Sequence, residues 1–172
     1  QDIPVSTQTY VVRSNIETID LERCYTGFEV GPDIFAVRYK SKSKGTLIKP
    51  INVKSKNFFN CVSLYLNVEK RVNVKIFNNG VFQFTGCKLI DHVVDSMSII
   101  LTVLLKIRCH SCKFDTFIYY IVSAMRNVDF EIGFKINRKA LGIAISNSTD
   151  YSVPPMTSGY MGVKIKIPVK NT

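Results

Sequence analysis

The clearest pattern along the chain is an alternation of apolar and polar residues from Val72 to Thr85. Such alternation is typical of β-strands that bury one face. The interruption at Asn78-Asn79-Gly80 predicts a hairpin turn, because an Asn-Gly pair suits a turn whose two central residues both have positive φ. Asn73, Lys75 and Phe77 share one parity of the first strand. Phe77 is therefore a large aromatic residue at a strand end, on the polar face.

Beyond the hairpin, the hydrophobic period changes from that of a strand to that of a helix. Apolar residues recur three and four positions apart, which predicts one amphipathic helix over residues 88–107. Asp91 lies near its start and Lys106 near its end, where each charge suits the helix dipole. We expect this helix to lie across one face of a sheet and to pack on Phe82 and Phe84. Runs of alternating or β-branched residues predict the strands: 9–16, 34–39, 59–68, 71–78, 81–86, 118–124 and 160–168.

Four short motifs follow one another around the hairpin: Phe59-Asn60-Cys61-Val62, Ile76-Phe77, Gly80 and Thr85-Gly86. Their order resembles the TATA-binding protein (TBP) family, with one extra residue between the two Phe. The resemblance implies an α+β fold in which a curved antiparallel sheet carries a helix on its convex face. It also implies a saddle with pseudo-two-fold symmetry.

Two weak similarities between segments of the chain favour an internal repeat. The sequence of residues 120–125 is similar to that of residues 10–15, and the sequence of residues 160–167 is similar to that of residues 59–66. The expected organisation is a tail at 1–9, a first TBP-like repeat at 10–108 with a lysine-rich insertion at 40–56, a linker at 109–116 and a partial second repeat at 117–172. The family pattern would run on past Thr172, so the second half is expected to be incomplete. A second chain that pairs with the 160–169 strand is the alternative.

The family binds the minor groove with the concave face of the sheet and forces paired Phe side chains between base steps. The resemblance implies that Phe59 and Phe77 form one such pair; the alternative is that both are ordinary core aromatics. Parity and the family motifs together give the expected DNA-binding residues: Phe59, Val62, Arg71, Asn73, Lys75, Phe77, Val81, Gln83, Thr85, Tyr160 and Val163. The family carries Val where Gln83 stands, and Gln83 could accept from the amino group of guanine. A strict TATA preference is therefore not expected.

The chain of 172 residues has a net charge of +10, which favours a polyanionic partner such as nucleic acid. Lysines gather between residues 40 and 56, with Ser and Gly between them. This stretch is either a solvated surface loop or an arm that contacts phosphates. In the second case its basic contacts are independent of DNA sequence and sensitive to salt: Lys40, Lys42, Lys44, Lys54 and Lys56.

Other chemistry is sparse in the sequence. The five cysteines are an odd and scattered set, which indicates reduced thiols in an intracellular compartment. Cys109-His110-Ser111-Cys112 offers half of a zinc site at most, and a linker with incidental thiols is the alternative. Catalytic motifs and paired carboxylates are lacking, so we expect a non-enzymatic protein without a cofactor. The longest apolar run, residues 99–107, is far too short to span a membrane.

These observations predict a TBP-like transcription initiation factor that binds and bends double-stranded DNA. The resemblance implies a B-type general transcription factor and RNA polymerase as further partners. The divergent, Lys/Asn/Ile-rich sequence suits a large DNA virus, with the nucleus, a viral factory or the virion as the location. Two other functions remain open: a structural or assembly protein that reuses the saddle as a scaffold, and a generic binder of single-stranded nucleic acid.

Overall fold

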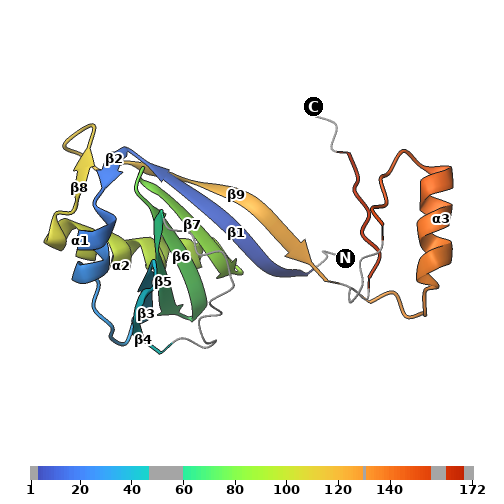
Figure 1. The fold of residues 1–172 in the computed structure, drawn as a ribbon, viewed down its shortest axis with the longest axis horizontal. Coiled ribbons are helices and arrows are strands. Elements are labelled where there is room, and N and C mark those ends of the chain that lie inside the picture. Colours follow the sequence, from blue (N-terminus) through green and yellow to red (C-terminus); the bar gives the residue numbers. More distant parts are fainter. Residues whose placement is uncertain (1–3, 47–59, 130, 156–161, 169–172) are drawn as a thin grey trace. The chain divides into compact units, whose positions relative to one another are not determined.

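The structure is a computed structural model that describes residues 4–46, 60–129, 131–155 and 162–168. The chain divides into two compact units, residues 1–130 and residues 131–172. The first unit is α+β and contains an antiparallel sheet of seven strands in the order β4-β3-β5-β6-β7-β1-β9 (Figure 1). The strands are β1 (Val5–Ser14), β3 (Ile34–Tyr39), β4 (Lys42–Gly45), β5 (Cys61–Val68), β6 (Lys70–Phe77), β7 (Val81–Cys87) and β9 (Tyr119–Val128). A small second sheet pairs β2 (Ile16–Ile19) with β8 (His110–Cys112).

Two helices cover one side of the large sheet. Helix α2 (Asp91–Ile107) contacts β5, β6 and β7, and the shorter α1 (Leu21–Gly27) contacts α2, β3 and β5. Phe82 and Phe84 are fully buried in the core beneath them. The remaining fully buried side chains of that core include Val12, Val37, Val62, Leu64, Leu66, Val74, Ile76, Met97, Ile100 and Leu104. The structure therefore confirms the predicted α+β fold and places the predicted helix on the face that Phe82 and Phe84 occupy.

The predicted hairpin forms at the predicted place, but its turn has a different geometry. Of the three turn residues only Gly80 has a positive φ, at +73°, so the expectation of two positive φ angles is wrong. The N–H of Gly80 donates to the carbonyl of Phe77 at 3.3 Å, as in a longer turn that ends on a left-handed glycine. A Cβ at Gly80 would lie 2.5 Å from the carbonyl oxygen of Ile16. The turn is further stabilised by the Ser14 hydroxyl, which donates a hydrogen bond to the Gly80 carbonyl at 2.7 Å.

Helix α1 was not expected from the sequence, although its start signal is present. The side chain of Asp20 accepts from the backbone N–H groups of Glu22 at 3.1 Å and Arg23 at 3.0 Å, which is the usual N-cap arrangement. This cap satisfies backbone donors that the start of α1 leaves unpaired. Helix α2 has no side-chain cap at its N-cap residue Ile90. The buried His92 of its first turn instead accepts through Nδ1 from the N–H groups of Lys88 and Leu89, in the loop before the helix.

Strand β9 pairs with β1 along its whole length, from Val5–Val128 to Ser14–Tyr119. Residues 119–128, which the sequence places in the second repeat, thus belong to the sheet of the first unit. The division of the chain into two TBP-like repeats stays a prediction.

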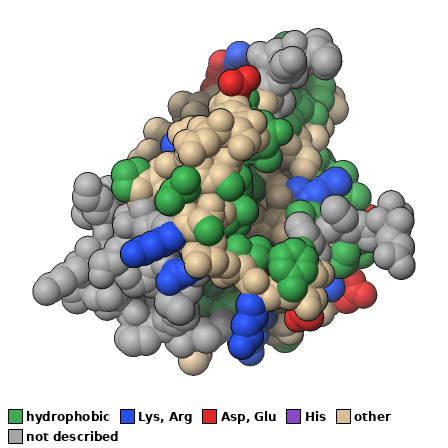
Figure 2. Space-filling view, turned by 90° about the vertical axis from the view of Figure 1, so that its right-hand side faces the viewer, with side chains coloured by type: hydrophobic (Ala, Val, Ile, Leu, Met, Phe, Trp, Pro, Cys, Tyr) green, Lys and Arg blue, Asp and Glu red, His purple; other side chains and the backbone are tan. Residues whose placement is uncertain are grey.

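The second unit contains helix α3 (Arg138–Ser148), whose first turn is capped by Asn137. The strand predicted at 160–168 is not formed over residues 162–168; Tyr160 lies outside the described residues. A strand needs a neighbour over several residues, whereas in the described part of this unit Lys166 forms a single β-bridge with Ser152. Figure 2 shows one face of the molecule, on which hydrophobic side chains and Lys and Arg side chains are both exposed. Phe134, at 70% exposure, is the most exposed large hydrophobic residue among those described.

Candidate nucleic-acid interface

The side of the large sheet opposite α1 and α2 is the candidate interface, and we call it the open face. Its side chains are half-buried or exposed, in contrast to the fully buried residues beneath the helices. The strand register and the alternation place these residues on it: Val11, Arg13, Phe35, Arg38, Ser63, Tyr65, Asn67, Arg71, Asn73, Lys75, Phe77, Val81, Gln83, Thr85, Tyr120 and Val122.

The register aligns open-face residues into rows that run across the strands. Lys75 of β6 lies between Ser63 of β5 and Gln83 of β7. Ser63 in turn pairs with Arg38, and Gln83 pairs with Val11. One row therefore runs across six strands in this order: Arg38, Ser63, Lys75, Gln83, Val11 and Val122. The neighbouring row contains Tyr65, Asn73 and Thr85.

The open face brings together seven of the residues that the sequence selected for DNA contact: Arg71, Asn73, Lys75, Phe77, Val81, Gln83 and Thr85. The expectation for Val62 is wrong. Val62 pairs with Ile76, is fully buried and faces the helices, because its parity is opposite to that of Ser63. Phe59 and Tyr160 lie outside the described residues, and Val163 belongs to the second unit.

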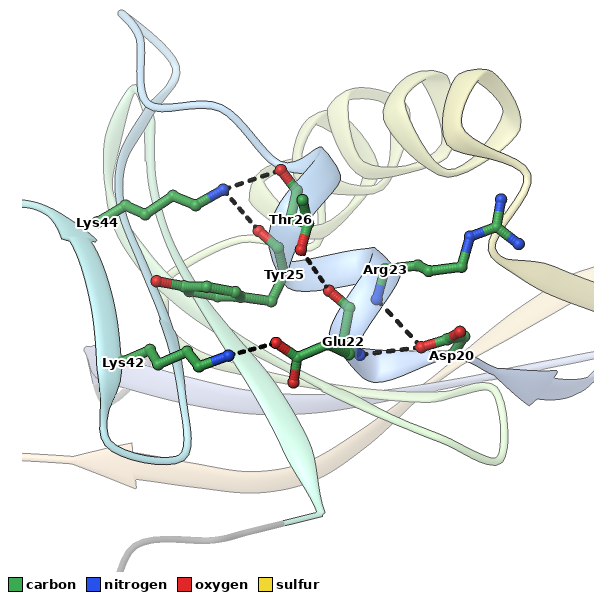
Figure 3. Close-up of polar contacts among 7 residues, drawn as sticks. All are labelled: Asp20, Glu22, Arg23, Tyr25, Thr26, Lys42 and Lys44. Atoms are coloured by element: carbon green, nitrogen blue, oxygen red, sulfur yellow. Dashed lines mark hydrogen bonds and ion pairs between the residues drawn. The ribbon is translucent and has the colours of Figure 1, made fainter.

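The lysines at the start of the basic stretch are on the helix side. Lys42 pairs with Tyr39 and Lys44 with Val37 in the β3–β4 hairpin, and both partners are buried beneath α1. Lys42 forms an ion pair with Glu22 of α1 (Figure 3). The ammonium of Lys40, in the turn, lies 4.7 Å from the centroid of the Tyr39 ring. The hairpin thus directs these three lysines away from the open face, and their contact with phosphates stays a prediction. Lys54 and Lys56 lie outside the described residues.

Lys44 instead stabilises the end of α1. Its ammonium donates to the carbonyl oxygens of Tyr25 at 2.8 Å, Thr26 at 2.9 Å and Phe28 at 3.0 Å; Figure 3 shows the first two. The ammonium also lies 4.8 Å from the centroid of the Tyr25 ring. A cation at a helix C-terminus satisfies carbonyls that have no partner within the helix and suits the helix dipole.

We expect Lys44→Met to lower the free energy of unfolding by ~1–3 kcal/mol, because it leaves these carbonyls without their charged donor. Urea denaturation followed by circular dichroism measures the change. Lys42→Met is the matched control, since an ion pair exposed to solvent contributes little to stability. Equal losses in the two variants would contradict the role assigned to Lys44.

The strands of the large sheet are basic and carry no acidic residue at all. Their basic residues are Arg13, Arg38, Lys42, Lys44, Lys70, Arg71, Lys75 and Arg126. The acidic residues of the first unit's described part lie instead in α1, α2, β2 and the connecting loops. Arg13, Arg38, Arg71 and Lys75 are the members of the basic set that lie on the open face. These four cations, with no carboxylate in the strands, suit a surface that meets a polyanion.

Several polar groups on the open face are engaged within the sheet. The amide nitrogen of Asn73 donates to the carbonyl of Leu64 at 3.0 Å, and the Thr85 hydroxyl donates to the carbonyl of Asn73 at 3.4 Å. Ser63 hydrogen-bonds to the Cys61 thiol. Burial raises the pKa of the Cys61 thiol, while the charge of Lys75 and this hydrogen bond oppose the rise. These contacts fix the middle of the open face before any ligand binds.

The sequence interpretation missed the contribution of the flanking strands. Phe35 and Tyr65 form a ring pair on the open face with centroids 5.9 Å apart, and the Arg71 guanidinium lies 5.6 Å from the Phe35 ring. Arg38 and Val11 extend the central row on either side. Alternation within β3 and β1 carried a signal for these residues, but only the strand register shows that they join the same face.

The described residues hold no group of three or more His, Cys, Asp or Glu side chains placed to bind a metal ion. Cys109 contacts the thiol of Cys24 in the core; this hydrogen bond raises the pKa of Cys24 and lowers that of Cys109. Within the same residues, no helix is both long and apolar enough to cross a membrane.

The fold and the open face together define an α+β protein with a large antiparallel sheet, one side covered by helices and the other side basic. No protein-family model matches the chain. A curated relative from Acanthamoeba polyphaga mimivirus, named TATA-box-binding protein-like, is 28% identical over 126 residues. The match covers 64% of this chain and 34% of the relative, so the chain spans about a third of that protein's length.

Proposed function

We propose that this chain is a DNA-binding transcription initiation factor that binds duplex DNA in the minor groove with its open face and bends it. The name of the mimiviral relative supports the class, and the motifs around the hairpin support the mode of binding. In this proposal the sheet forms half of a TBP-like saddle. A B-type general transcription factor and RNA polymerase are the proposed protein partners, and the nucleus or a viral factory is the proposed location.

The observation that carries the proposal is the charge of the strands. The seven strands hold no acidic residue, and four of their eight basic residues lie on the open face, although acidic residues are frequent in the helices and loops around them. A sheet that served only as a scaffold for the core would have no reason to exclude carboxylates from its solvent side. A DNA duplex does supply that reason, because an acidic side chain would face the phosphates.

The pairing of β1 with β9 supports the saddle. Tyr10 pairs with Ser123, and Arg13 pairs with Tyr120. If residues 120–123 are the repeat equivalents of residues 10–13, Tyr120 corresponds to Tyr10 and Ser123 corresponds to Arg13. A two-fold rotation that exchanges the repeats then converts one of these pairs into the other. A local two-fold axis would then pass between the strands, as a pseudosymmetric saddle requires. Phe77, half-buried on the open face beside the hairpin turn, is the proposed wedge between base steps.

Binding and bending of labelled duplexes by the full chain test the proposal. We expect energy transfer between dyes at the two duplex ends to rise on binding, since bending brings the ends together. The logarithm of the affinity should fall with the logarithm of salt concentration, with a slope of about −3 to −4 if the four open-face cations each meet a phosphate. Binding without a change in energy transfer would contradict minor-groove bending.

A specific observation favours one second candidate, a binder of single-stranded nucleic acid. The Phe35–Tyr65 pair offers ring faces near Arg71, and stacking of bases on such rings is independent of sequence. A preference for single strands over the duplex would support this candidate. Loss of any nucleic-acid affinity would instead favour an assembly scaffold.

A further inference from the structure

We infer that Gln83 makes the open face tolerant of guanine in the minor groove, by accepting a hydrogen bond from the guanine N2 amino group. This inference rests on the minor-groove binding proposed above and names the residue that sets its base preference. The minor groove offers acceptors at every base pair, and the guanine amino group is the added donor that distinguishes G·C from A·T. An acceptor at the groove floor therefore lets a side chain pair with guanine instead of excluding it.

Gln83 differs from the polar residues around it in its hydrogen bonds. The Asn73 amide, the Thr85 hydroxyl and the Ser63 hydroxyl are engaged within the sheet. Within the described residues the structure gives the Gln83 amide no hydrogen-bond partner, and neither of its polar atoms is sealed from solvent. An amide carries both a donor and an acceptor. Gln83 can thus donate to the acceptors of an A·T pair or accept from a guanine amino group.

The position of Gln83 in the central row places it where a base edge would lie. On one side of it the row is basic, with Lys75 and Arg38; on the other side it is apolar, with Val11 and Val122. Cations are expected to meet the phosphates that border the groove, whereas apolar side chains suit its floor. Gln83 stands at the boundary and is the polar side chain of the row closest to the apolar part. Its amide is therefore the group placed to contact bases.

Inosine provides a test that changes a single group, because it is guanine without the N2 amino group. Two duplexes of identical sequence, one with G·C and one with I·C pairs, are titrated with the full chain, and the ratio of the two dissociation constants is measured. We expect Gln83→Val and Gln83→Met to shift this ratio about fivefold toward the inosine duplex, which is the effect of one lost hydrogen bond. Ser98→Ala, which changes an exposed polar residue of α2 away from the open face, should leave the ratio unchanged.

The outcomes separate this inference from the function on which it rests. Wild-type protein that binds neither duplex contradicts minor-groove binding itself. Wild-type protein that binds both duplexes, with the same ratio in the two Gln83 variants, overturns the role of Gln83 alone. Melting temperatures are measured for all variants; Gln83→Met keeps the length of the side chain, so it remains informative if Gln83→Val fails to fold.

Discussion

Neutralising Arg38, Arg71 and Lys75 together, each to Gln, is expected to weaken duplex binding about a hundredfold at low salt, because each cation contributes a charge-assisted contact to a phosphate. These three residues lie on strands β3 and β6 of the open face, with Lys75 in the central row. The slope of the affinity with salt should also decrease in magnitude, by ~0.9 for each phosphate contact removed. Fluorescence anisotropy titrations over a series of salt concentrations measure both quantities.

The matched control removes the same charge from elsewhere. Lys88, Lys106 and Lys113 are exposed and lie outside the strands of the large sheet. Their replacement by Gln should leave the salt slope nearly unchanged. If the two triple variants lose affinity equally, the protein binds DNA through its overall charge and the open face has no special part.

Phe77→Ala is expected to abolish most of the DNA bending while leaving the free energy of unfolding nearly unchanged. Phe77 lies on the open face and is half-buried, so its ring is available as a wedge and contributes little to the core. Without a wedge, the unstacking that bends the duplex is no longer compensated. Energy transfer between end-labelled duplexes and urea denaturation of the same variant give the two values.

Phe84→Ala supplies the opposite pattern. Phe84 is fully buried beneath α2, so truncation should cost ~3–5 kcal/mol of stability through lost burial and a residual cavity. Any loss of DNA binding by that variant should follow its unfolding. A comparable loss of stability in Phe77→Ala would show that Phe77 is a core residue and would contradict its role as a wedge between base steps.

The sequence predicts most of what depends on local periodicity. Alternation around Phe82 and Phe84 places β6, β7 and their buried face correctly, and the helical period places α2 within three residues of its start. Helix α1 was missed because a helix of seven residues is too short for its hydrophobic period to be recognised, even though Asp20 marks its beginning. The same alternation predicts seven residues of the open face, because all seven lie on the two adjacent strands of one hairpin.

What the sequence does not predict depends on pairing between distant strands. Lys42 and Lys44 look like a solvated arm by composition, yet pairing with β3 turns both toward α1. Arg38 joins the central row only through the register of β3 with β5, which the sequence does not specify. The turn at Gly80 takes its form from close contact with Ile16, some sixty residues earlier in the chain.

The separation of charge between strands and helices also bears on how fast the protein finds DNA. Arg13, Arg38, Arg71 and Lys75 lie on the open face and the strands carry no carboxylate, whereas Glu22, Asp91 and Asp95 lie in the helices. We expect the field of an approaching duplex to turn the open face toward the phosphates before contact. Fewer collisions then occur in unproductive orientations, which raises the association rate. The gain fades as salt shortens the Debye length below ~10 Å, so ionic strength controls the rate of encounter as well as the strength of the complex.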